Sequence, residues 1–186
     1  MASGRFWFQG QACPRKAVFF MRIAFYTLGC KVNQYETQIL EQLIAQRGYT
    51  LVSPEEDVYL VNSCTVTASG DQKTRQMLRR FKRRSPHAVT VLTGCYPQAF
   101  PDQAAQLTEA DLITGTSERS KLPQLVEQLL AGGERLVAVK AHRPHEAFEP
   151  MQADGFLERT RAFVKIEDGC DRYCAYCIIP TARGPV

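Results

Sequence analysis

From Met21 to about Lys140 the sequence alternates short apolar runs with longer segments that have helical periodicity. Strands that alternate with helices favour a parallel sheet, because the connection between two parallel strands crosses the sheet and is usually a helix. The sequence therefore predicts an α/β fold with a doubly wound parallel sheet. The expected strands are residues 23–28, 58–61, 88–93 and 111–114. The expected helices run from Asn33 to just before Gly48, from 68 to 84, near 98–107, and from about Ser120 to just before Gly132.

The first two expected helices have the clearest patterns. Asn33 and Glu36 have the spacing of a capping box, which predicts Asn33 as the residue that caps the first helix. In the second helix, four residues at helical spacing are expected to face the sheet: Thr74, Met77, Leu78 and Phe81.

The segment before this domain has a different character. Residues 1–20 contain short apolar pieces broken by Pro14, and they lack the continuous apolar core of a signal peptide. We expect an irregular extension in which Cys13 has no role. Met21 is then the natural start of the folded N-terminal domain, residues 21–140.

The segment after the domain divides into two parts. Residues 141–158 have no hydrophobic period and contain two prolines and a glycine, which indicates a linker. Residues 160–166 then have the pattern of a new strand. We expect this strand to open a second domain over residues 159–186.

Composition excludes several classes of protein. With 45% hydrophobic and 23% charged residues, the chain is neither disordered nor collagen-like. No run approaches eighteen apolar residues, so we expect no membrane span. Its seven cysteines are too sparse for a small secreted disulfide scaffold. They favour free thiols that bind metal in a reducing compartment, and therefore a cytoplasmic protein.

Three cysteines, Cys30, Cys64 and Cys95, each follow one of the first three expected strands. Parallel strands end at one edge of the sheet, and that edge is where folds of this kind bind ligands. Topology is therefore expected to bring these three thiols together as metal ligands. The alternative is three unrelated buried thiols, since Cys is often a small core residue.

A second cysteine group is much tighter. Cys170, Cys174 and Cys177 are separated by three and then by two residues. Three thiolates at this spacing suit three corners of an iron–sulfur cube, which leaves one iron open to another ligand. The alternative is a structural zinc site that takes its fourth ligand from elsewhere in the chain.

The second group, with Tyr176 as the aromatic residue before its last cysteine, resembles the radical S-adenosylmethionine motif. Together with the three upstream cysteines it is similar to the radical S-adenosylmethionine methylthiotransferases, in register from Met21 to the end of the chain. The stretches that match this family are residues 27–37, 62–67, 93–96 and 164–184. The first stretch resembles the branch that acts on N6-threonylcarbamoyladenosine in tRNA, beside the anticodon.

The resemblance implies two four-iron–four-sulfur clusters, one on each cysteine group, and S-adenosylmethionine as a further cofactor. The cluster on the second group would bind S-adenosylmethionine and cleave it to a 5′-deoxyadenosyl radical, with Tyr176 near the adenine. The radical would abstract hydrogen from C2 of the target adenine. The cluster on the first group would deliver the methylated sulfur. Beyond the cluster ligands, no catalytic residue is implied.

The resemblance also implies partners and a larger protein. The partners are a tRNA anticodon stem-loop and an electron donor such as a flavodoxin or ferredoxin. Members of the family continue into a radical S-adenosylmethionine barrel, and a full barrel needs on the order of 250 residues. This chain stops soon after Cys177. We therefore expect the N-terminal part of such an enzyme, with the truncated start of the barrel, inactive by itself.

The formal net charge of +4 is unevenly distributed, because residues 71–90 alone carry seven basic residues and one acid. Arg75, Arg79, Lys82 and Arg83 recur at helical spacing within this segment. A basic helix face attracts phosphates without reading base sequence, so we expect it to contact the RNA. The alternative is an ordinary solvated helix face.

Other functions fit parts of the pattern. One is a metal-binding, RNA-binding module without catalysis. Another is a methylthiotransferase that acts on isopentenyladenosine in tRNA or on a ribosomal protein.

Overall fold

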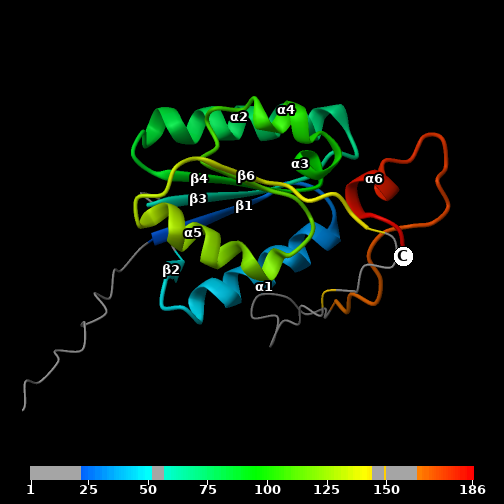
Figure 1. Cartoon of the computed structure of the whole chain (residues 1–186), viewed down its shortest axis with the longest axis horizontal. Coiled ribbons are helices and arrows are strands. Elements are labelled where there is room, and N and C mark those ends of the chain that lie inside the picture. The colour runs from blue at the N-terminus through cyan, green and yellow to red at the C-terminus, as the bar shows by residue number, and fades with distance from the viewer. Residues whose placement is uncertain (1–21, 52–56, 144–148, 150–162) are drawn as a thin grey trace, which may run out of the picture.

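The computed structural model describes residues 22–51, 57–143, 149 and 163–186. These residues form a six-stranded sheet in the order β2-β1-β3-β4-β5-β6 (Figure 1). Every pair of neighbouring strands is parallel, which confirms the predicted doubly wound α/β fold. The strands are β1 (Arg22–Thr27), β2 (Thr50–Leu51), β3 (Val58–Ser63), β4 (Val89–Gly94), β5 (Leu112–Thr114) and β6 (Leu136–Ala138).

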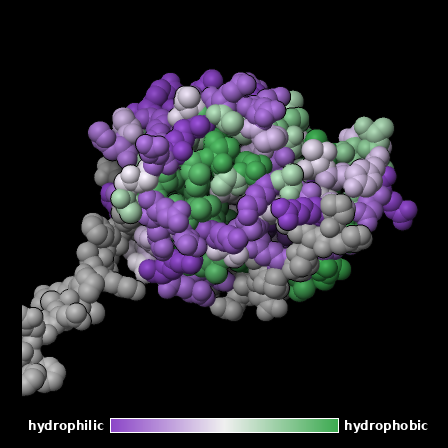
Figure 2. Space-filling model, viewed as in Figure 1, coloured by the Kyte–Doolittle hydropathy of each residue, from purple (hydrophilic) through white to green (hydrophobic). Residues whose placement is uncertain are grey.

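Helices cover both faces of the sheet, as Figure 1 shows. The helices α1 (Lys31–Ala45) and α5 (Leu122–Leu130) lie on one face, and α5 follows the 3₁₀ turn η1 (Arg119–Lys121). The opposite face carries α2 (Ala68–Arg84), α3 (Cys95–Ala99) and α4 (Pro101–Ala105). In Figure 2, hydrophobic residues are visible between these layers, and hydrophilic residues dominate the outer surface. No described helix is long and apolar enough to cross a membrane.

The core includes the whole of β3, whose six residues are all buried. The predicted inner stripe of α2 is confirmed, since Thr74, Leu78 and Phe81 are buried and Met77 packs against the same cluster. The ring of Phe81 stacks on that of Tyr59 with 4.2 Å between centroids. Burying one such side chain contributes about 1.5–3 kcal/mol. The sheet therefore holds α2, and with it the basic segment, in one fixed orientation.

The capping prediction for the first helix is wrong. The N-cap of α1 is Cys30, without a side-chain cap hydrogen bond, and Asn33 lies inside the helix. The Asn33 side chain turns toward the sheet instead, where its amide nitrogen donates to the carbonyl oxygen of Ser63 at 2.7 Å. A fully buried amide must find partners in the interior, and that demand overrides the local capping preference.

Other elements differ from the expectation in length. The helix expected near residues 98–107 is two short helices, α3 and α4, separated by Phe100. The short strands β2 and β6, which the sequence analysis did not predict, extend the sheet at its two edges. Strands of two or three residues are too short to produce a recognisable alternation.

The sequence predicts a strand over residues 160–166, but the part of this segment that the structure describes is not a strand. Residues 163–166 are described and are irregular, with Val164 and Ile166 81% and 86% exposed. An extended segment becomes a strand only when a neighbouring strand accepts its hydrogen bonds, and none pairs with it among the described residues. The start of a barrel is therefore not seen, and the only element described in this part is helix α6 (Ile179–Arg183). The predicted extension, including Cys13, and most of the predicted linker lie outside the described residues.

Candidate metal centre at the carboxyl edge of the sheet

The strand order reverses beside β1, because β2 lies on one side of it and β3 on the other. In open parallel sheets, ligands bind at the carboxyl ends of the strands at such a reversal. Cys64 directly follows β3, Cys95 directly follows β4, and Cys30 lies in the turn after β1. We call these three residues the first cysteine triad.

The side chain of Asn33 lies at the centre of this triad. Its oxygen Oδ1 accepts from the Cys30 thiol at 3.3 Å and lies 4.0 Å from the Cys95 sulfur. Its nitrogen Nδ2 donates to the carbonyl oxygens of Ser63 and Leu28, at 2.7 and 3.3 Å. One buried amide thus ties the ends of β1 and β3 together and contacts two of the three sulfurs.

Gly29 brings the third sulfur to the same place. Its backbone has φ +122°, a conformation that residues with a side chain rarely adopt. A Cβ atom added at Gly29 would lie 2.4 Å from the Cβ of Cys64 and 2.9 Å from its sulfur. Only glycine permits the turn that carries Cys30 to pack directly on Cys64.

The surroundings of the three thiols suit their binding to a metal as thiolates. All six described cysteines are free thiols, with Cys64 and Cys95 buried and Cys30 exposed. Burial raises the pKa of the Cys95 thiol, while the guanidinium of Arg183, with Nε 3.3 Å from its sulfur, acts to lower that pKa. The backbone N–H of Val66 points to the Cys64 sulfur at 3.5 Å. Donors aimed at sulfur are typical of cluster sites, because they offset the negative charge of the thiolates.

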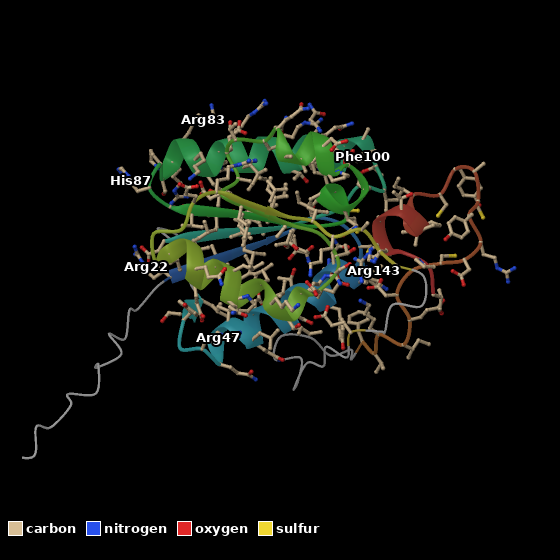
Figure 3. The ribbon with its side chains drawn as sticks, in the orientation of Figure 1. Arg22, Arg47, Arg83, His87, Phe100 and Arg143 are labelled. Carbon is tan, nitrogen blue, oxygen red and sulfur yellow. The ribbon has the colours of Figure 1, made fainter. Side chains whose placement is uncertain are left out.

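Cys170, Cys174 and Cys177, the second cysteine triad, lie on the loop that precedes α6, where Figure 3 shows several sulfur atoms. Cys174 is exposed and the other two are half-buried. The N–H of Cys177 donates to the carbonyl oxygen of Cys174 at 2.9 Å, so this end of the loop is a tight turn. Tyr176, the residue expected near the adenine, is 92% exposed.

Neither triad is arranged around a single metal ion. Across the residues that the structure describes, no three Cys, His, Asp or Glu side chains converge closely enough to hold one ion. An iron–sulfur cube spreads its thiolates over different irons, so such convergence is not what it requires. Three free thiols at one sheet edge, with donors beside them and a glycine that clears the space, fit such a cube.

A buried ion network connects the two triads. Glu36 on α1 is 1% exposed and contacts three cations. Its carboxylate lies 3.2 Å from Arg119 Nη2, 2.9 Å from Lys165 Nζ and 3.0 Å from Arg183 Nη2. Asp168 also lies in the network, 3.1 Å from Arg183 Nη1. Burial acts to raise the pKa of Glu36, but the charges of Arg119, Arg183 and Lys165 overcome it and lower the pKa to about 2.

The sequence pattern does not predict this network. Glu36 has the spacing of a capping box, and Arg183 lies within a stretch that matches the family. One signal was available, because Asn33, Glu36 and Thr37 continue the buried stripe of Leu40 and Ile44 at helical spacing, and all five are buried. Polar residues on the inner side of a helix indicate buried partners.

The four basic residues proposed to contact RNA lie along α2 but differ in their surroundings. Arg75 lies over the ring of Tyr96, and Lys82 forms an ion pair with Asp111 at 2.7 Å. Arg79 pairs with Glu109 at 3.1 Å and is mostly exposed, as is Arg83. Figure 3 shows Arg83 at the end of α2 that lies away from α6.

Comparison with known proteins identifies the family. Residues 22–115 match the family model described as "Uncharacterized protein family UPF0004". The chain is 40% identical over 168 residues to the threonylcarbamoyladenosine tRNA methylthiotransferase MtaB of Aquifex aeolicus, across 89% of this chain and 41% of that protein. It is also 40% identical to the protein of the same name from Bacillus subtilis, across 87% of this chain and 36% of that one. The ribosomal protein uS12 methylthiotransferase RimO of Heliobacterium modesticaldum is 31% identical, across 91% and 38%.

This chain thus spans about two fifths of the length of the curated relatives it matches. The family match covers β1 to β5 and includes all three cysteines of the first triad. The resemblance predicted from the sequence is confirmed by relatives that all carry methylthiotransferase names. The chain belongs to the UPF0004 family.

Proposed function

We propose that this chain is the N-terminal part of a radical S-adenosylmethionine enzyme that methylthiolates tRNA. Its target is C2 of N6-threonylcarbamoyladenosine, next to the anticodon. The observation that carries this proposal is the first cysteine triad, three free thiols gathered at the strand-order reversal around one buried amide. The names of the relatives with 40% identity support the choice of nucleoside.

In this proposal each triad binds one four-iron–four-sulfur cluster. When bound, the cluster on the second triad supplies the electron that cleaves S-adenosylmethionine, and the cluster on the first triad supplies the sulfur. The chain's own residues hold and shield these groups. Asn33 and Gly29 fix the spacing of the first triad, and the walls of β3 and β4 exclude water from its inner side. Tyr176 is available to pack on the adenine of S-adenosylmethionine.

Helix α2 supports an RNA substrate. Arg79 and Arg83 are exposed on its outer side, and Arg80 and Arg84 extend the same exposed surface. Such a surface attracts the phosphates of a stem-loop and positions it without reading its bases. A small redox protein, such as a flavodoxin or ferredoxin, is the proposed electron donor. The proposed domains are 21–140 for the first triad and 159–186 for the start of the barrel, with a linker between them.

Mass spectrometry of tRNA nucleosides tests this function. Deleting the gene in its native host should remove the 2-methylthio group from threonylcarbamoyladenosine and leave isopentenyladenosine derivatives unchanged. Complementation with the wild-type gene should restore the modification, and complementation with Cys64→Ala should not. Loss of the methylthio group from isopentenyladenosine, or from ribosomal protein uS12, would assign the enzyme to one of the other branches. An unchanged tRNA and uS12 profile would contradict methylthiotransferase activity.

A further inference from the structure

We propose that Arg183 is a positioning residue that fastens the second cysteine triad to the first. It acts through the buried network of Glu36, Arg119, Lys165, Asp168 and Arg183, which we call the Arg183 latch. The docking itself is a property of the metal-free chain. Its consequence for the clusters rests on the proposed function.

One guanidinium reaches both halves of the site. Nε of Arg183 donates to the Cys95 sulfur at 3.3 Å, and Nη2 donates to Asn33 Oδ1 at 3.1 Å. Nη1 donates to Asp168 Oδ1 at 3.1 Å and also contacts Glu36. The arginine side chain is 4% exposed, so all these contacts are made out of water. Arg183 therefore touches a thiol of the first triad, the amide that organises it, and an acid two residues before Cys170.

The fold delivers Arg183 to this point through α6. This helix packs against α3, the helix that begins with Cys95. The hydroxyl of Thr116 donates to the carbonyl oxygen of Ala182 at 2.8 Å, which fixes the last turn of α6 beyond the end of β5. The carbonyl oxygen of Gly184 then accepts from the N–H of Cys170 at 3.0 Å. Ala182, before Arg183, is thus hydrogen-bonded to the sheet edge, and Gly184, after it, is hydrogen-bonded to the cysteine loop.

The contact set calls for arginine in particular. A guanidinium presents five N–H donors in a rigid planar fork, whereas the lysine ammonium is a compact point charge with three. The guanidinium of Arg183 donates to acceptors on four different residues. A lysine at this position would keep the charge but could not reach these acceptors together. Charge and geometry can therefore be separated by experiment.

The latch gives the two triads one fixed relation. In the proposed function both clusters act on a single nucleoside, and such joint action needs the two groups held in register. Most of the latch is supplied by residues next to the triads: Glu36 follows Cys30 on α1, and Asp168 and Arg183 flank the second triad. The latch is therefore placed to transmit a shift of either triad to the other.

Hydrogen exchange and cysteine labelling of the metal-free chain test the latch. The variants are Arg183→Lys and Glu36→Gln, and the matched controls are Arg172→Lys, on the exposed cysteine loop, and Glu134→Gln, exposed just before β6. In both latch variants we expect backbone exchange across α6 and labelling of buried Cys95 by iodoacetamide to accelerate at least tenfold. Labelling of the exposed Cys174 should not change in any variant.

Two results would overturn the proposal. One is protection of α6 and Cys95 that is the same in the latch variants as in wild type. The other is a loss of protection in β3 and β4 of Arg183→Lys, the variant that keeps the charge, as large as the loss in α6, since that would make the network a general core element. Exchange of β3 and β4 is recorded in the same experiment, so a variant that fails to fold is recognised directly.

A second measurement reads the effect on the cluster. In a chain with Cys170, Cys174 and Cys177 replaced by Ser, we expect the first triad alone to bind iron and sulfide after anaerobic reconstitution. Arg183→Met should make the midpoint potential of that cluster more negative, because a cation beside a thiolate favours the reduced state, and Arg183→Lys should fall between. An identical midpoint potential with Arg, Lys or Met at position 183 would refute an effect of Arg183 on the cluster. A wild-type chain that binds no sulfide would defeat the proposed function and leave the exchange result intact.

Discussion

Replacing Glu36 with Gln removes the negative charge at the centre of the latch and keeps the shape of the side chain. The glutamate is 1% exposed, and Arg119, Lys165 and Arg183 all lie against it. In the variant Arg119 and Arg183 remain buried and Lys165 half-buried, with only Asp168 to balance them. Breaking a buried ion pair by removing one partner costs about 3–5 kcal/mol.

The pKa of Glu36 gives an independent value for the same interaction. Burial acts to raise this pKa, but the three cations outweigh it and lower the pKa from 4.5 to about 2 in the folded protein. At 1.36 kcal/mol per pH unit, this shift is worth about 3 kcal/mol of stability at neutral pH. Because the folded pKa is the lower one, this stability is present above pH 4.5 and is lost as the pH falls toward 2. At pH 3 about 2 kcal/mol of it has gone.

Urea unfolding followed by circular dichroism at 222 nm measures both effects. We expect Glu36→Gln to lower the free energy of unfolding by about 3 kcal/mol at pH 7 and by about 1 kcal/mol at pH 3. Glu134→Gln, exposed just before β6 and outside the latch, should change it by less than about 0.5 kcal/mol. A Glu36→Gln effect below about 1 kcal/mol at pH 7, or one that is equal at both pH values, would refute the reasoning.

Three further perturbations test other parts of the structure. Gly29→Ala puts a Cβ 2.4 Å from the Cβ of Cys64 at a positive φ, so thermal unfolding should show a loss of stability above about 2 kcal/mol. Gly132→Ala, with a positive φ but nothing within 4 Å, should lose only about 1 kcal/mol, and equal losses would contradict the close packing. Leu78→Ala should cost about 2–5 kcal/mol in urea unfolding, because the side chain is fully buried, and a smaller loss would contradict the described packing of α2. Arg79→Glu with Arg83→Glu should weaken tRNA binding and flatten its dependence on salt in a titration series, whereas unchanged binding at every salt concentration would remove α2 from the RNA interface.

The main elements could be predicted because their patterns are long and regular. The stripe of α2 has enough turns to define its inner side, and β3 begins with four apolar residues in a row. The edge strands β2 and β6 could not be predicted, since two or three residues do not define a period. At Asn33 a local pattern was misleading, because the capping signal described one helix end and the buried amide serves the ends of two strands.

The candidate site was predictable only in part, for a related reason. Parallel topology predicts that residues following β1, β3 and β4 share an edge, so the first triad could be derived from the order of strands alone. The latch could not be predicted, because Glu36 and Arg183 lie near opposite ends of the described chain. The sequence around either residue does not indicate that the two are in contact. The packing of α6 against α3 and the hydrogen bond from Thr116 to Ala182 bring them together.

Iron and acid-labile sulfide content after anaerobic reconstitution tests the central claim most directly. Two triads that each hold a four-iron–four-sulfur cluster predict about eight irons and eight sulfides per chain. Cys64→Ala and Cys174→Ala should each remove half of both, and the double variant nearly all. Zinc without sulfide, or iron and sulfide that both single variants leave unchanged, would contradict the account.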